Sequence, residues 1–289
     1  MLWLYLALIA YFINAFVFII DKHLLSGHIP KHNAYAFGVA VLSSFAVLLI
    51  PFGVSWQSGS YTLVAFLSGI ASFIGLMFLY KAVKESDISV ASTQVGTVSA
   101  VSTYLFSIAI LKDTLPLFNL AAFIFLIAGL LLLGKVAKHI LLSAIFAGIL
   151  FGLSYVFLKL SFNAGDFING LFWTRMGFAG SAFASLLVPQ MRREVRLSYA
   201  GAPKSSKFLF VFNKLTAAAG FIVLYFAIRL GNVSLVNALL GLQFMFVFLL
   251  ALTLKNNISG IGERLNKEVL LYKLAGMGCV LIGLVLLFK

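Results

Sequence analysis

Charge is scarce in this sequence, and acidic side chains and cysteine are scarcer still. Of the 289 residues 10% are charged and only 8 are acidic, whereas about 25% of the residues of an ordinary soluble domain are charged. The hydrophobic residues, 62% of the chain, carry more apolar surface than a soluble core of this length can bury. These proportions exclude a soluble enzyme and a disordered chain. The single cysteine, Cys279, excludes a disulfide and a thiolate metal cluster within one chain.

Long apolar runs are what the sequence has in abundance. A helix that spans a membrane needs about 20 predominantly apolar residues. Runs of this kind predict an all-α polytopic membrane protein with ten transmembrane helices. The runs are 2–20, 35–53, 61–80, 88–111, 116–134, 139–159, 168–189, 209–229, 232–254 and 269–288. The first run begins without a basic leader, so we expect it to be a span and not a signal peptide.

Two of the connections between these runs are long. Residues 190–208 contain Arg192, Arg193 and Arg196 among apolar side chains. This connection is either an interfacial amphipathic segment or a solvated loop, and the loop is the interpretation that we favour. The other connection, 255–268, contains Glu263.

The two halves of the chain resemble each other. Residues 79–84 (Leu-Tyr-Lys-Ala-Val-Lys) match residues 224–229 (Leu-Tyr-Phe-Ala-Ile-Arg), and the small or polar residues that follow recur at the same spacing. Lys22 and Lys159 each close the first span of their half. These correspondences predict two units of five helices, 1–135 and 136–289. Because five is odd, the second unit enters the membrane inverted, as in many secondary transporters.

This layout resembles the drug/metabolite transporter superfamily, in its ten-helix EamA-type branch. Each half of that family has a fourth helix entered through a string like residues 80–92 or 225–237. An acidic turn and a glycine-bearing fifth helix follow, as in residues 113–129. The resemblance covers essentially the whole chain. It implies a secondary transporter that moves a small organic metabolite by alternating access, without covalent chemistry.

The fourth span, 88–111, is the most polar one. Its small and hydroxyl residues recur at steps of three and four and so form one stripe, which the ninth span repeats in part. Such a stripe allows close helix packing, and it also suits a pocket lined by hydroxyl groups. In the sixth span Ala144, Gly148 and Gly152 form a small-residue seam, which we interpret as packing.

Arg175 is the charged residue that the predicted spans place well inside the membrane, about seven residues into the seventh run. Burying an arginine in a membrane costs roughly 2.5–3.5 kcal/mol on insertion scales, so such a residue has a partner or faces a water-filled cavity. One interpretation is structural, with the side chain reaching headgroups or helix-end carbonyls. The functional interpretation is a positive potential in the cavity that favours an anionic or zwitterionic, amino-acid-like substrate.

We expect the substrate cavity between spans one, three, four, six, eight and nine. The residues predicted to bind substrate are Tyr11, Asn14, Tyr80, Ser92, Ser99, Tyr155, Arg175, Tyr225 and Asn237.

Other chemistry is excluded by what the spans lack. The eight acidic residues, Asp21 among them, fall in predicted loops or at helix ends. Proton-coupled drug export of the kind seen in the related small multidrug-resistance proteins, which use a carboxylate in the first helix, is therefore not expected. His28 and His32 are spaced like metal ligands but have no nearby acidic or thiol partner, so we expect no metal and no cofactor. No catalytic pair lies at depth, which argues against an intramembrane enzyme.

The main prediction is therefore a metabolite transporter in the cell membrane, functional as a monomer. Its expected partners are the lipid bilayer and a small-molecule substrate. The alternative is a flippase of the same superfamily that moves a lipid or lipid-linked carrier. The net charge of +13 lies almost wholly in loops, so we read it as a topology signal and do not expect a nucleic-acid partner. A scaffold or receptor would not need an inverted repeat.

The loop charges predict the orientation in the membrane. The connections after the odd-numbered spans, counted with Lys273 near the start of the tenth span, hold 15 Lys and Arg residues. The other side, counted with the span-end residues Lys159 and Arg229 and with Lys289, holds 4. Since positive loops face the cytoplasm, both termini are expected outside it. A reporter fused to the C-terminus that is active only outside the cytoplasm should give a signal. A cytoplasmic signal would contradict the charge count.

Overall fold

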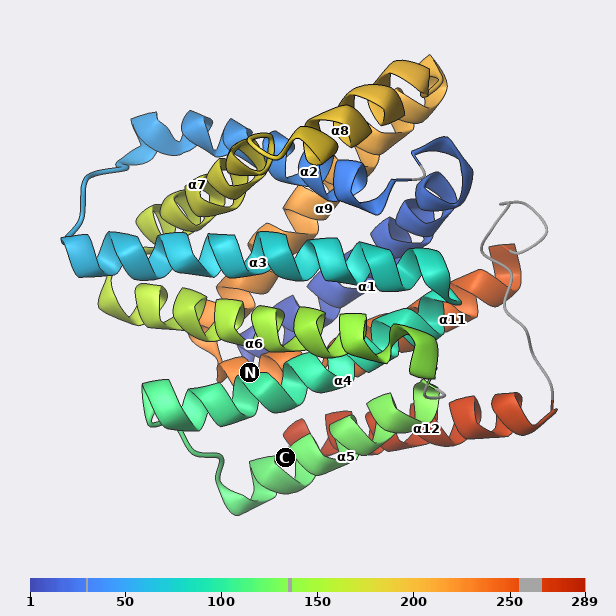
Figure 1. Cartoon of the computed structure of the whole chain (residues 1–289). Helices are drawn as coiled ribbons and strands as arrows, with labels where there is room; N and C mark the ends of the chain where they lie inside the picture. Colours follow the sequence, from blue (N-terminus) through green and yellow to red (C-terminus); the bar gives the residue numbers. More distant parts are fainter. Residues whose placement is uncertain (30, 135–136, 255–266, 289) are drawn as a thin grey trace.

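The computed structural model describes residues 1–29, 31–134, 137–254 and 267–288, and all of its regular secondary structure is helical (Figure 1). Several spans change helix type or break along their length. The first half contains α1 (Leu2–His23) with the π turn η1 (Leu24–His28), α2 (His32–Leu42) with the 3₁₀ helix η2 (Ser43–Phe52), α3 (Gly59–Glu85), α4 (Ile88–Phe106) with η3 (Ser107–Leu111), and α5 (Leu117–Leu133). The second half contains η4 (Lys138–Ile140), α6 (Leu141–Ala164), α7 (Phe167–Ser185), α8 (Pro189–Gly201), α9 (Lys204–Leu230), α10 (Val233–Ala238), α11 (Leu240–Leu254) and α12 (Lys267–Leu287).

Every predicted apolar run is helical in this structure. Within the described residues, eight helices are long and apolar enough to cross a membrane, or nine if α7 and α8 form one broken span. The remaining apolar helix, α5, has only 17 residues. The chain is thus an all-α, multi-pass membrane protein.

The connection 190–208, for which we favoured a solvated loop, is mostly the helix α8. It makes an angle of 100° with α7. Pro189 occupies the first turn, where a missing N–H costs nothing, and Met191 is buried while Arg192, Arg193 and Arg196 are exposed. The solvated loop was therefore wrong, and the segment is a helix whose arginines lie on its exposed face. Most of the other long connection, including Glu263, lies outside the described residues.

Glycines set the closest helix crossings. A Cβ on Gly148 would lie 2.5 Å from Val98 Cβ, and one on Gly152 would lie 2.9 Å from the backbone nitrogen of Thr103. The seam of α6 therefore packs on α4, which confirms its predicted packing role. Helices α3 and α7 cross in the same way, because Gly69 faces the backbone of α7 and Gly177 faces that of α3.

Helices α5 and α12 lie side by side at one edge of the bundle (Figure 1). A Cβ on Gly129 would lie 2.9 Å from the carbonyl oxygen of Gly276, and one on Gly283 would lie 3.0 Å from that of Ala122. The two halves match here as well, because Ala128-Gly129-Leu130 resembles Ile282-Gly283-Leu284, and Ala122 and Gly276 each stand seven residues before the glycine. The two contacts therefore use residues that the repeat pairs, Ala122 with Gly276 and Gly129 with Gly283. They are therefore reciprocal, as contacts across a two-fold axis are.

Two lysines close the third helix of each half in the same manner. Lys22 Nζ donates to the carbonyl oxygens of Val83 (2.6 Å) and Ser86 (2.8 Å) at the end of α3. Lys159 Nζ donates to those of Ile228 (3.0 Å) and Gly231 (2.9 Å) at the end of α9. A cation at a helix C-terminus satisfies unpaired carbonyls and the helix dipole. The charge of each lysine is thus used to hold two helices together.

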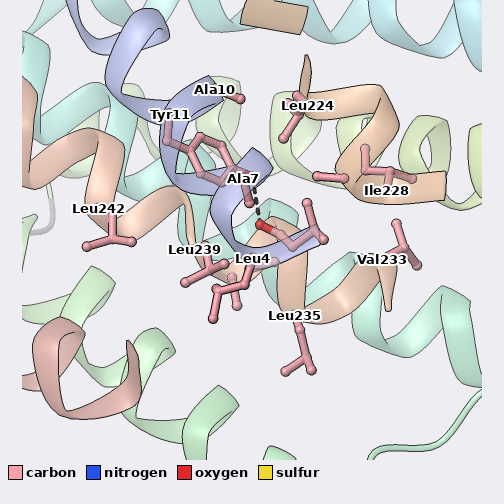
Figure 2. Packing of buried hydrophobic residues seen from close by; sticks show 14 of the residues in the cluster. Leu4, Ala7, Ala10, Tyr11, Leu224, Ile228, Val233, Leu235, Leu239 and Leu242 are labelled. Atoms are coloured by element: carbon pink, nitrogen blue, oxygen red, sulfur yellow. Dashed lines mark hydrogen bonds between the residues drawn. The ribbon is translucent and has the colours of Figure 1, made fainter. Parts of the chain in front are cut away.

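Buried side chains gather in two clusters toward opposite ends of α1. Figure 2 shows the first, in which Leu4, Ala7 and Tyr11 of α1 pack against Leu224 and Leu239. The second surrounds the last turns of α1 and the π turn η1 that follows, from Ala15 to Ile29. The space between the two clusters is where the candidate site lies.

The crossing of α5 and α12 can be tested with two glycines of one helix. Gly276→Ala would place a methyl group against the backbone of α5, whereas Gly278 has nothing within 4 Å of a Cβ. We expect Gly276→Ala to lower the free energy of unfolding by about 1–3 kcal/mol, the usual cost of overpacking. Gly278→Ala is the control and should leave it unchanged or slightly higher. Thermal unfolding in detergent measures both, and equal effects would contradict the crossing.

Candidate functional site

A cavity of about 360 Å³ lies in the middle of the bundle. Its wall comes from α1, α2, η2, α3, α4, α6, α7, α9 and α11. Six spans were expected to line it, and all six do. The expectation omitted the second and seventh spans, which also contribute because α2 and η2 pack on α7 and close that side of the bundle. The volume is in the range of pockets that hold small organic ligands.

Eight of the nine residues predicted to bind substrate line this one cavity. They are Tyr11, Asn14, Tyr80, Ser92, Ser99, Tyr155, Arg175 and Tyr225.

The ninth, Asn237, lies outside the cavity wall. Its amide donates to Ser99 Oγ (3.0 Å) and Thr103 Oγ1 (2.6 Å), so it joins α10 to α4. The stripe on α4 is also largely satisfied within the protein, since Ser92 Oγ donates to the carbonyl oxygen of Ile88 at 2.5 Å. The contacts of Asn237 and Ser92 are thus those of helix packing.

Hydrogen bonding divides the polar groups of the cavity into two sets. Tyr11 donates to the carbonyl oxygen of Val236 (2.7 Å), and Tyr80 donates to Asp21 (2.9 Å). In contrast, six polar cavity side chains form no hydrogen bond with any residue that the structure describes: Asn14, Ser43, Tyr155, Arg175, Tyr225 and Gln243. Of these six, Ser43 and Gln243 were not among the residues predicted to bind substrate. A cavity ligand can use these groups without breaking a bond within the protein.

Arg175 is fixed by the start of its helix and by aromatic rings. Asp166 caps α7 by accepting from the backbone N–H of Asn169 (2.8 Å). Partial burial alone would raise the pKa of this carboxyl, but the hydrogen bonds from Asn169 outweigh it and hold the pKa below its usual value. Two turns further on, the guanidinium lies 5.0 Å from the ring of Tyr225 and 5.6 Å from that of Phe221.

The half-buried Arg175 faces the cavity and no anion. Within the described ranges it has no carboxylate within 4 Å and no carbonyl that accepts from it. Of the two interpretations of this residue, its position fits the one that places the charge in a cavity. Stacking on the two rings stabilises the guanidinium partly, because aromatic faces attract cations.

A second charged group in the wall was not expected. Asp21 of α1 forms an ion pair with Lys214 of α9, and the two side chains are 3% and 5% exposed. The same carboxylate accepts from Tyr35 (2.7 Å), Tyr80 (2.9 Å) and Asn213 (2.6 Å). We call these five residues the Asp21 cluster. It joins α1, α2, α3 and α9.

The sequence analysis was therefore wrong about the intramembrane charges. It placed Asp21 at the end of the first span, but the helix continues to His28, so Asp21 lies inside it. It singled out Arg175, whereas Lys214 and Lys273 are also buried within candidate spans. Lys273 donates to Ser89 at 2.5 Å. Only Leu24 and Leu25 are apolar among the seven residues after Asp21, so no local apolar run marks the continuation of the helix. A pairing across 193 positions leaves no trace in one sequence either.

Comparisons with known proteins agree with this architecture. Residues 1–135 match the model of the EamA-like transporter family. A crystal structure of another protein has the same fold, with a TM-score of 0.60, 15% identical residues, and an alignment that covers 96% of this chain and 95% of the other. At that identity the likeness shows the fold alone. No curated protein matches the sequence significantly. Residues 1–135, just under half of the chain, thus belong to the EamA-like transporter family, which is a family of membrane transporters and not of enzymes.

Proposed function

We propose that the protein moves a small organic anion or an amino-acid-like zwitterion across the cell membrane by alternating access, and that Arg175 binds the anionic group. The observation that carries this proposal is the guanidinium of Arg175, which lines the cavity without an anion among the described residues. A buried positive charge lacking a counter-charge is costly, and a bound carboxylate or phosphate removes that cost.

The charges of the wall support an anionic substrate. Asp21 and Lys214 neutralise each other, so Arg175 leaves the cavity with a net charge of about +1 by formal counting. Most of the other lining residues are apolar, among them Phe18, Phe151 and Phe244. An apolar wall strengthens the attraction between the guanidinium and an anion, because it screens charge less than water does.

The remaining unpaired groups fit the rest of such a substrate. Asn14 and Gln243 offer amides from α1 and α11, and Tyr155 and Tyr225 offer hydroxyls from α6 and α9. The amide oxygen of Asn14 is buried and has no partner among the described residues. Groups from both halves of the chain thus surround one space, which is the arrangement of secondary transporters with internal repeats.

We further propose that ten helices cross the membrane as two inverted units, 1–135 and 136–289, and that one chain suffices for transport. The matching contacts of Lys22 and Lys159 and the reciprocal contacts of α5 with α12 support the repeat. The family match ends at residue 135, where the first unit was expected to end. The seventh span is then α7, with α8 lying along the membrane surface.

One observation favours the alternative, a carrier for a lipid or lipid-linked molecule. Phe45 of η2 and Ile222 of α9 line the cavity and are also 64% and 42% exposed. The side of the cavity between η2 and α9 is therefore rimmed by exposed apolar side chains at mid-span depth. Such a rim would admit an acyl chain from the bilayer.

Replacement of Arg175 tests the proposal. Arg175→Gln removes the charge and keeps a polar side chain, so uptake of carboxylate substrates into proteoliposomes should fall by about tenfold to a hundredfold, the value of a hydrogen bond to a charged group. The panel should contain amino acids, organic anions, organic cations and acyl-bearing anions, each with and without a pH gradient. Uptake confined to acyl-bearing anions would favour the lipid carrier.

Arg229→Gln is the matched control. Arg229 also lies over an aromatic ring, at 5.9 Å from Phe167, but it is exposed and outside the cavity. Its replacement should leave uptake within about twofold of the parent, as expected for an exposed residue. If Arg175→Gln folds and transports like the parent, or if only cations are transported, the proposal is wrong.

A further inference from the structure

We propose that the Asp21 cluster is the gate that seals the cavity toward the side of the membrane on which α1 ends, and that breaking it is the step that opens the site to that side. This inference rests on the proposed alternating access. The loop charges predict that this side is the cytoplasm.

The cluster lies where a gate has to lie. Asp21, Tyr80 and Lys214 line the cavity, so they form part of its wall. Further along the chain, beyond the end of α1, Leu24 of η1 and Ile29 directly after η1 are fully buried. In the other direction, Val17 lines the cavity one turn before Asp21. The carboxylate thus marks the boundary between the cavity and a closed layer of apolar side chains.

The cluster also joins the parts that must separate. Tyr35 and Tyr80 bond Asp21 within the first five-helix unit, whereas Asn213 and Lys214 come from the second. Rocking of one unit against the other, the motion expected for inverted repeats, has to pull α9 away from α1 at this point. The bonds of Asn213 and Lys214 to Asp21 are those that this motion breaks.

A charged seal suits an interface that opens in every cycle. A buried ion pair gives little net stability, and apolar residues of similar size often hold a structure at least as well. The ion pair and an apolar pair differ when the interface opens. Water hydrates the two separated charges, whereas exposing apolar side chains to water is unfavourable. The amide oxygen of Asn213 is buried with no partner among the described residues, so the closed cluster leaves one polar atom for water to satisfy.

The second half has no such cluster at its equivalent positions. The repeat aligns Asp21 with Leu158, Lys214 with Gly69, and Tyr35 with Thr174. A Cβ on Gly69 would lie 2.1 Å from the carbonyl oxygen of Thr174, so α3 and α7 meet there by close backbone packing. One end of the cavity is therefore held by charge and the other by packing, and the two ends should respond to different substitutions.

Thiol accessibility tests the gate without a known substrate. Cys279 is replaced by Ser, and Val17→Cys puts a thiol on the cavity side of the cluster. A membrane-impermeant thiol reagent is then added from the side on which α1 ends. We expect slow modification in this parent and modification about tenfold faster or more with Asp21→Asn or Lys214→Met, because removing one member strands a buried charge in the sealed state. Unchanged rates in both variants would overturn the gate.

Two further variants keep the test decisive. Asp113→Asn makes the same acid-to-amide change at a carboxylate outside the cavity, which accepts from Asn232 at 2.7 Å, and should not alter the rate. Tyr80→Phe removes one donor and leaves both charges, so it should give an intermediate rate even if the charge variants fail to fold. A Tyr80→Phe rate equal to the parent's would then count against the gate.

Replacing the ion pair with two apolar residues distinguishes a gate from an ion pair that is only structural. Asp21→Leu with Lys214→Met should stay folded and closed, with slow thiol modification. Its transport should fall about tenfold or more while substrate affinity stays the same, because opening now exposes apolar side chains to water. Transport at the parent rate would show that the pair is structural. If the parent itself transports nothing from the panel, the proposed function fails, and the thiol rates still judge the gate.

Discussion

The buried carboxylate of Asp21 is the interaction on which the middle of this molecule depends. A membrane offers no water to buried polar groups, so each must be satisfied by the protein. Asp21 meets this condition with Lys214, Asn213 and two tyrosines, and in doing so it fixes four helices at one point. The position of the cavity wall follows, because α1, α3 and α9 can diverge only beyond this point.

Charged side chains that have a partner within the protein and those that have none play different parts around the cavity. Lys22 and Lys159 are fully occupied with helix-end carbonyls, and Lys214 with Asp21, so their charges maintain the fold. Arg175 has only aromatic rings around it in the described structure. The fold therefore neutralises every described charge of the cavity except one, and the exception is the charge on which the proposed preference for anions rests.

The features of this structure that could be predicted from the sequence are the local and the periodic ones. The apolar runs, the seam at Gly148 and Gly152, and the small residues of α5 and α12 follow from hydropathy and helical spacing, and the structure contains them all. The ion pair of Asp21 with Lys214 could not be found in this way, because its members lie far apart in the chain and each stands near the end of an apolar run. The bend before α8 was missed for a related reason, since charged residues between spans look alike in a loop and in a surface helix.

In the proposed repeat, duplication accounts for the frame of the molecule, and divergence accounts for the chemistry of its cavity. The backbone contacts of the two halves correspond, as the lysine-capped ends of α3 and α9 show. The charges at the cavity do not correspond, since the repeat aligns Asp21 with Leu158 and Arg175 with Ala36. A symmetric frame has two closed forms of similar packing, which is what alternating access requires. In the proposed transport cycle, unequal charges make the two forms unequal in energy and in their attraction for an anion. The placement of a few ionised side chains then decides how a symmetric scaffold treats its substrate.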